Sequence, residues 1–153
     1  MITFESDPME HAGSVQTLNS FLRGEIAAVE TYRRALGSLT CRGRVEDLRD
    51  CLASHERRME RLRRRIVDLG GVPSESSGPW DGFARLCAGE CDAGDEDAAL
   101  AALEEGEDTG LKHYLDDVGK LDRDSRRFVA SDILPEQVRT HDSLSDLKLR
   151  LAG

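Results

Sequence analysis

Apolar residues recur in steps of three and four along four long stretches of the chain. These stretches cover about residues 14–39, 43–69, 95–120 and 123–151. In the first of them, the apolar positions are Val15, Leu18, Leu22, Val29, Leu36 and Leu39. Steps of this size place the side chains on one face of an α-helix, and no alternating pattern typical of strands competes with them. The pattern therefore predicts an all-α protein with four amphipathic helices.

The links between the predicted helices differ in length. A short connection around residues 40–43 joins the first two helices, and a turn near Asp122 joins the last two. The second and third helices are separated by a long segment that opens with Gly70-Gly71-Val72-Pro73, a strong helix stop. Two short links and one long crossover predict a single domain over residues 1–153, folded as an up-down-up-down four-helix bundle with a long middle crossover.

Two further details concern the crossover and the last helix. In the crossover, Trp80, Phe83 and Leu86 indicate a short helical turn that covers one end of the core. Pro135 lies inside the fourth predicted helix, where it removes a backbone donor and is expected to kink or break the helix. Hydrophobic residues make up 39% of the chain and aromatic residues only 5%, so we expect a core of Leu, Val, Ala and Ile.

Four polar residues interrupt the apolar seams, one in each predicted helix. They are Glu25, His55, Glu107 and His141. A buried carboxylate is costly unless it is paired, protonated or bound to a metal. Because each residue replaces an apolar member of its seam, we expect all four to face one another at mid-height in the interior of the bundle.

The two glutamates belong to a repeated motif, Gly-Glu-x6-Tyr. It occupies residues 24–32 and again residues 106–114. A Glu and a Tyr seven residues apart share one helix face. We therefore expect Tyr32 and Tyr114 two turns from the glutamates, as neighbours of the site and not as its ligands. The repeat also suggests that the two helix pairs are related by a pseudo-twofold axis.

Carboxylates and imidazoles together are a usable set of ligands for iron, manganese or zinc. Glu25, His55, Glu107 and His141 are therefore candidate metal ligands. Two other interpretations stay open. One is a metal-free core in which histidine pairs with buried glutamate through hydrogen bonds, and the other is a set of seam residues that never meet. The sequence indicates no catalytic residue and no organic cofactor.

The arrangement of these motifs resembles the ferritin-like superfamily, and it is most similar to a bacterial four-helix-bundle family that carries a domain of unknown function. The resembling segments are Gly24-Glu25 to Tyr32, Leu69 to Pro73, Gly106-Glu107 to Tyr114, and Leu134-Pro135-Glu136-Gln137 to Thr140-His141-Asp142. Di-iron members of the superfamily use a Glu from each of two helices and a Glu-x-x-His motif from each of the other two.

This chain departs from the di-iron motif. Three residues before His55 and His141 stand Leu52 and Val138, so the resemblance implies that both bridging carboxylates are absent. Because bridging carboxylates hold two adjacent irons together, a full di-iron oxidase or ferroxidase is disfavoured. One metal ion on two Glu and two His stays chemically reasonable.

The charge of the chain disfavours several kinds of partner. The net charge of −9 argues against nucleic acid and against an anionic membrane, because phosphate contacts need a basic surface. A basic run on the second helix is interpreted as a solvated face, and the alternative is that its members pair with carboxylates across helices or between subunits: Arg57, Arg58, Arg61, Arg63, Arg64 and Arg65.

The location of the protein is predicted from the absence of targeting signals. No apolar run is long enough to cross a membrane, and the N-terminus lacks the pattern of a signal peptide, so we expect a cytoplasmic protein with thiol cysteines. Cys87 and Cys91 have the spacing of half a zinc site, but no second pair follows them.

These observations support two hypotheses of different classes. In the first, the chain is a ferritin-like bundle that forms a homodimer, has no catalytic activity and keeps a buried Glu/His core as the remnant of a metal site. In the alternative, the core binds iron, manganese or zinc in a mononuclear or weakened dinuclear site with a redox or storage function. The missing glutamates at positions 52 and 138 favour the first hypothesis, and the repeated Glu/His seam favours the second.

Overall fold

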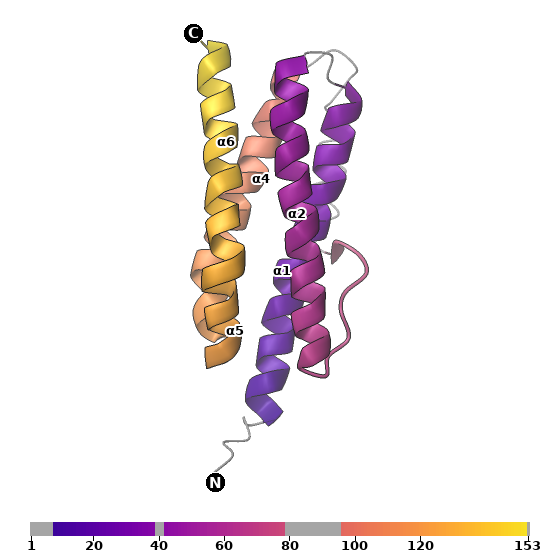
Figure 1. Cartoon of the computed structure of the whole chain (residues 1–153). Helices are drawn as coiled ribbons and strands as arrows, with labels where there is room; N and C mark the ends of the chain where they lie inside the picture. Colours follow the sequence, from indigo (N-terminus) through magenta and orange to yellow (C-terminus); the bar gives the residue numbers. More distant parts are fainter. Residues whose placement is uncertain (1–7, 39–41, 79–95, 153) are drawn as a thin grey trace.

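The computed structural model describes residues 8–38, 42–78 and 96–152, and all regular secondary structure in these ranges is helical. The helices are α1 (Pro8–Ser38), α2 (Arg42–Asp68), α4 (Glu96–Asp117), α5 (Arg123–Phe128) and α6 (Leu134–Ala152). A 3-10 turn, Val118–Lys120, follows α4, and a π-helical turn, Val129–Ile133, joins α5 and α6 into one rod. The described residues thus form four long helical segments that lie side by side, and the prediction of an all-α protein is confirmed (Figure 1).

Capping and proline residues explain where these helices begin. α1 starts at Pro8, earlier than the predicted position near residue 14, because proline fits the first turn of a helix, where no intrahelical N–H bond is lost. Asp122 caps α5 by accepting a hydrogen bond from the backbone N–H of Ser125. Pro135 follows Leu134, the first residue of α6, directly after the π-turn. The fourth helix therefore changes from α to π geometry just before Pro135 and continues beyond it as one rod.

The directions of the helices correct the predicted up-down-up-down order. α1 runs up and α2 runs down in the view of Figure 1. α4 also runs down, antiparallel to α1, because Tyr32 contacts Glu107 whereas Tyr114 contacts Glu25. α6 then runs up beside α4, so the order is up-down-down-up, with α2 and α4 parallel (Figure 1). The predicted order was wrong because a long crossover lets the chain return before the third helix begins.

The turn that follows α2 begins this return. Gly70 adopts a positive φ of 80°, a conformation that glycine takes without strain and that ends the helix. Gly71 packs closely against α1, and a Cβ atom added to it would lie 2.6 Å from Cγ1 of Val15. The two glycines therefore bring the chain back onto α1 immediately after α2.

The described part of the crossover then runs along α1. Asn19 donates a hydrogen bond of 3.0 Å to the carbonyl of Val72 and accepts one of 2.8 Å from the backbone N–H of Ser74. At the other end of the molecule, Glu96 at the start of α4 pairs with Arg44 near the start of α2 at 2.7 Å. α2 and α4 thus begin at the same end, as their parallel direction requires.

The buried side chains form two apolar clusters with a polar layer between them. The cluster nearer the start of α1 includes Leu18, Phe21, Leu22, Leu62, Ile66, Val129 and Ile133. The other cluster includes Ala35, Leu48, Leu100, Leu103, Leu144 and Leu147. The core is mainly aliphatic, as the composition predicts, and the polar layer is its exception.

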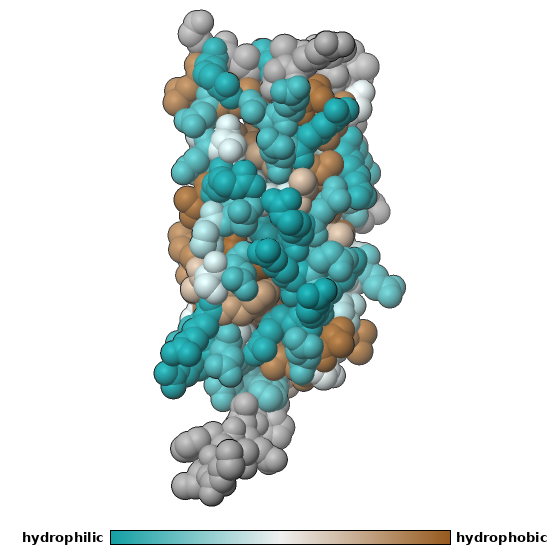
Figure 2. All heavy atoms as spheres, viewed as in Figure 1, coloured by the Kyte–Doolittle hydropathy of each residue, from teal (hydrophilic) through white to brown (hydrophobic). Residues whose placement is uncertain are grey.

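The outer faces of the helices are mostly polar. Hydrophilic side chains cover much of the face shown in Figure 2, which includes the outward side of α2. No helix in the described ranges combines the length and the apolar character that crossing a membrane requires. Among the cysteines, Cys51 is a buried free thiol.

Several sequence expectations lie outside the described residues. They concern the turn with Trp80, Phe83 and Leu86 and the cysteines Cys41, Cys87 and Cys91.

Candidate functional site

The polar layer joins all four helical segments at mid-height. Each of its residues is 3% exposed or less, and they are Glu25 of α1, His55 and Arg58 of α2, Glu107 of α4, and Gln137 and Thr140 of α6. The two members from α2, and likewise the two from α6, are three positions apart and share one helix face. The layer therefore brings polar groups together from segments far apart in the sequence.

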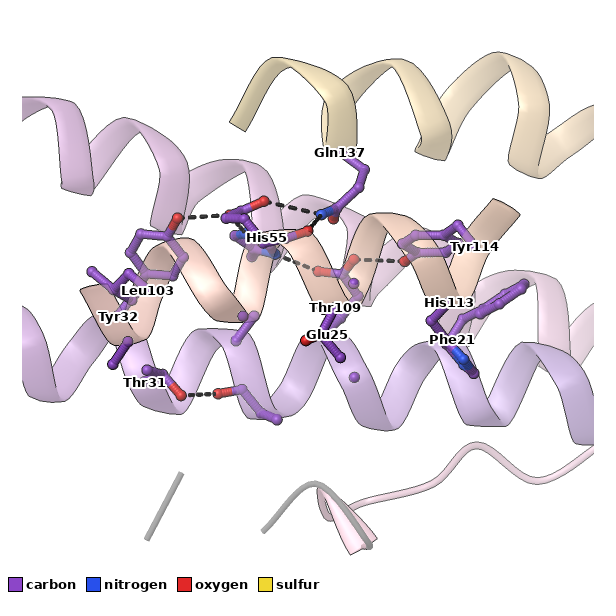
Figure 3. Close-up of a pocket in the computed structure, with 17 residues that line it drawn as sticks. Phe21, Glu25, Thr31, Tyr32, His55, Leu103, Thr109, His113, Tyr114 and Gln137 are labelled. Carbon is purple, nitrogen blue, oxygen red and sulfur yellow. Dashed lines mark hydrogen bonds and ion pairs between the residues drawn. The ribbon is translucent and has the colours of Figure 1, made fainter. Parts of the chain in front are cut away.

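His55 lies between the two glutamates. Its Nδ1 is 2.6 Å from Oε2 of Glu25, and its Nε2 is 2.6 Å from Oε1 of Glu107 (Figure 3). A neutral imidazole has one N–H donor and one bare acceptor nitrogen, and that acceptor would here face a carboxylate oxygen. With both glutamates ionised, only the imidazolium donates to both of them, so the geometry favours the charged form of His55. The predicted Glu/His hydrogen bonds are confirmed for these three residues.

The surrounding charges favour the ionised form of all three groups. Burial acts to lower the pKa of His55, but the carboxylates of Glu25 and Glu107 outweigh it, and the pKa is raised above its ordinary value of 6.5. Burial acts to raise the pKa of each glutamate. The charges of Arg58 and His55 outweigh burial at Glu25, and the charge and hydrogen bond of His55 do so at Glu107, so both pKa values lie below 4.5.

The two tyrosines of the repeated motif contact the cluster in a crossed arrangement. The hydroxyl of Tyr32 donates to Oε1 of Glu107 at 2.6 Å, and that of Tyr114 donates to Oε1 of Glu25 at 2.6 Å. Each tyrosine therefore donates its hydrogen bond to the glutamate of the other repeat, because α1 and α4 are antiparallel. Burial, reinforced by the adjacent carboxylate, raises the pKa of both hydroxyls well above 10.0 and keeps them protonated as donors.

Arg58 supplies the second positive charge of the cluster and is 0% exposed. Its Nη1 lies 3.4 Å from Oε1 of Glu25 and also donates to Oε1 of Gln137. Its Nη2 donates to the hydroxyl of Thr140 at 3.1 Å, and its Nε donates to the backbone carbonyl of Ser54 at 3.4 Å. The interpretation of the arginine run as a solvated face is therefore wrong for Arg58.

α6 completes the set of donors around Glu107. The amide Nε2 of Gln137 donates to Oε2 of Glu107 and to its backbone carbonyl, both at 3.0 Å. The hydroxyl of Thr140 lies 2.9 Å from the same Oε2. With His55 and Arg58 charged, two carboxylates face two cations, and every carboxylate oxygen has a donor. The cluster is electrically neutral and fully hydrogen-bonded.

His141 is not part of this cluster, and the prediction that it faces the other three residues is wrong. It lies at the surface, with its side chain 24% exposed, 2.6 Å from Asp108 and 3.3 Å from Asp142. The physical reason is register. The offset that relates Glu25 to Glu107 and Tyr32 to Tyr114 relates His55 to Gln137, so His141 stands about one helical turn beyond the position that matches His55.

The same offset is the signal that could have found the missing members of the site. It relates Arg58 to Thr140 as well as His55 to Gln137, and all four side chains belong to the polar layer. Matching the two halves by residue type selected His141, whereas matching them by position selects Gln137. The pseudo-twofold relation expected from the repeat therefore extends to the second helix of each half.

The positions compared with the di-iron motif also need correction. Leu52 is partly buried and packs on the apolar cluster that contains Leu48. Val138 is 41% exposed and does not face the core. By the register of the repeat, the position that corresponds to Leu52 is Leu134, which packs on the other cluster. Neither Leu52 nor Leu134 can supply an oxygen ligand to the core.

The residues of the layer do not fit the iron, manganese or zinc site that the resemblance suggests. The imidazole of His55 separates the two carboxylates, and its nitrogens point in opposite directions to Glu25 and Glu107. Among the described residues, no group of three or more His, Cys, Asp or Glu side chains is placed to hold a metal ion. A metal would also add positive charge to a neutral cluster whose lone pairs are already engaged.

A cavity of about 50 Å³ lies beside the cluster, between α1 and α4 (Figure 3). Its lining includes Gly24 and Gly106, the glycine of each repeat, together with Ala28 and Ala102. The repeated Gly-Glu pair thus has two effects. The glutamate builds the ion cluster, and the glycine leaves the adjacent space open.

Comparison with family models found no match to the chain, and no curated protein and no solved structure matches it significantly. Fold and site therefore define only a class: an all-α protein of four helical segments, in the described residues, around a buried ion cluster.

Proposed function

We propose that the chain is a ferritin-like four-helix module with a structural or binding role, in which an ion cluster made of its own side chains stands where related bundles hold metal. The up-down-down-up order with one long crossover supports this assignment, because ferritin-like bundles have one long crossover connection. The repeat of a Gly-Glu-x6-Tyr helix followed by a second helix supports it further.

The observation that carries the proposal is the saturation of the two buried carboxylates. Glu25 receives hydrogen bonds from His55 and Tyr114, and Glu107 receives them from His55 and Tyr32 in addition to two donors of α6. Oxygen atoms that are all engaged with donors offer no open coordination position. Redox chemistry at a bound metal is therefore not the function that this geometry supports.

The cluster is suited to fixing the register of the helices. A buried ionic group is strongly destabilising when one partner is removed, so a sliding or rotated helix would leave a charge unpaired. Here the partners come from α1, α2, α4 and α6, and each segment contributes at least one of them. The cluster thus favours one packing of the four segments over alternatives that would bury the apolar seams equally well.

Elemental analysis and iron oxidation test this function. Protein purified without an affinity tag is expected to contain iron, manganese and zinc well below one equivalent, and its thermal midpoint should not change with a chelator. Added ferrous iron should oxidise in air no faster than in buffer. Rapid oxidation that is lost in Glu107→Gln, but kept in the surface variant Asp108→Asn, would overturn the proposal and favour the metal-binding alternative.

A further inference from the structure

The surroundings of Arg58 have the composition of a cation site. Four oxygen atoms face its three guanidinium nitrogens: a carboxylate oxygen of Glu25, the amide oxygen of Gln137, the hydroxyl of Thr140 and the backbone carbonyl of Ser54. They come from α1, α2 and α6. The arginine is 0% exposed, so all of these contacts are made away from bulk solvent.

The balance of charge shows what this cation does. His55 alone cannot neutralise Glu25 and Glu107, because one imidazolium faces two carboxylates. Arg58 brings the cluster to neutrality, and among the described residues that contact the two glutamates it is the other positive side chain. Without it, one buried negative charge would remain uncompensated, a strongly unfavourable state in a low-dielectric interior.

We propose that this oxygen cradle is a guanidinium-binding site that the chain fills with its own Arg58, and that it takes up a free guanidinium ion when the side chain is shortened. The fit is specific to this class of cation because a planar fork reaches Gln137, Thr140 and Ser54 with separate nitrogens, which a spherical ion or an ammonium does not do. The inference deepens the proposed function and rests on its metal-independent cluster.

Chemical rescue of Arg58→Ala tests the cradle. The variant should unfold at a lower temperature than the wild type, and millimolar guanidinium chloride should raise its midpoint by several degrees. Ammonium and sodium chloride at equal ionic strength should not. Arg61→Ala is the matched control, since Arg61 lies on the same helix, is exposed and contacts the carbonyl of Asp132. Neither the control nor the wild type should gain stability from guanidinium.

Each outcome decides the question. If Arg58→Ala does not fold alone, recovery of its helical circular dichroism in guanidinium supports the cradle, and no recovery overturns it. Equal effects of guanidinium, ammonium and sodium overturn the specificity.

A second variant of similar volume, Arg58→Met, tests the balance of charge. Combined with Glu25→Gln, it should lose less stability than the sum of the two single losses, and simple additivity overturns the charge-balancing role. Iron oxidation by the wild type does not enter these measurements, so a failure here is distinct from a failure of the proposed function.

Discussion

The hydroxyl of Tyr32 donates a 2.6 Å hydrogen bond to Glu107, the glutamate of the repeat to which this tyrosine does not belong. The reciprocal bond, from Tyr114 to Glu25, has the same length. Antiparallel packing of the two helices makes the exchange necessary, since a Tyr that is seven residues after its own Glu reaches the level of the other Glu only in that orientation. The two repeats thus form one site with His55 at its centre.

Removal of His55 should be one of the most damaging single changes in the chain. In His55→Leu the two buried carboxylates lose their shared cation, and breaking a buried ion pair costs about 3–5 kcal/mol. His141→Leu removes a histidine that is 24% exposed, so its cost should stay within about 0.5 kcal/mol. Urea unfolding followed by circular dichroism measures both. Similar losses for the two variants would contradict the placement of His55 and His141.

The stability of the fold should depend on pH through the cluster. His55 has a raised pKa, so its contribution is full below the ordinary value of 6.5 and is lost as pH rises through its folded pKa. Glu25 and Glu107 have lowered pKa values, so their contribution is full above 4.5 and is lost as pH falls through their folded pKa values. The cluster, which also includes Arg58, should therefore contribute most to the unfolding free energy between pH 4.5 and pH 6.5.

The pH dependence is measured as a difference between variants. The unfolding free energy of the wild type minus that of His55→Gln should decline as pH rises above 6.5. His141→Gln is the comparison: Asp142 and Asp108 outweigh burial and raise the pKa of that partly exposed histidine as well, so its difference should decline in the same direction, but by less because solvent screens its ion pairs. If the unfolding free energy of the wild type minus that of His55→Gln instead rises above pH 6.5, His55 is neutral in the folded state.

The crossed pairing of the tyrosines predicts which double variants are coupled. Tyr32→Phe removes a donor from a buried carboxylate and should cost about 1.5–3 kcal/mol, because hydrogen bonds to charged groups contribute that much. Combined with Glu107→Gln, its effect should be clearly less than additive. Combined with Glu25→Gln, it should be nearer to additive. Stronger coupling of Tyr32 to Glu25, the glutamate of its own repeat, would contradict the observed geometry.

The sequence was sufficient for the parts of the structure that depend on local periodicity. The four helices follow from apolar steps of three and four, and Glu25, His55 and Glu107 stand out because each interrupts such a seam. The direction of α4 was not predictable in this way, because the length of a crossover does not specify the path it takes. Its direction is set by contacts between Gly71 and α1 and between α1 and α4.

Arg58 shows why the remainder of the site was missed. It stands among five other arginines, and a basic run is usually a solvated face. Its burial depends on Gln137 and Thr140, which are distant in the sequence and become its neighbours only through the packing of α6 on α2. Both residues lie in a segment that resembles the ferritin-like superfamily, but only the register of the repeat assigns them to the layer.

The register also predicts how a metal site could be created. Gln137 occupies the position that corresponds to His55, and the internal cation of Arg58 makes the cluster neutral. In the combined variant Arg58→Ala/Gln137→His, the core would hold two glutamates and two imidazoles with no buried guanidinium. We expect this variant to gain binding of zinc or manganese, because the carboxylates then lack a compensating cation and a second imidazole stands opposite Glu107.

The gain is measured as a rise of the thermal midpoint with zinc or manganese that a chelator reverses. Gln137→His alone should show no rise, since Arg58 still supplies the positive charge. Leu52→Glu/Val138→Glu should also fail, because Val138 is 41% exposed and a glutamate there would project toward solvent. The opposite result would be metal-dependent stabilisation of Leu52→Glu/Val138→Glu and none of Arg58→Ala/Gln137→His. It would show that the register of the two repeats does not extend to α6. It would also show that Arg58 is not what prevents metal binding.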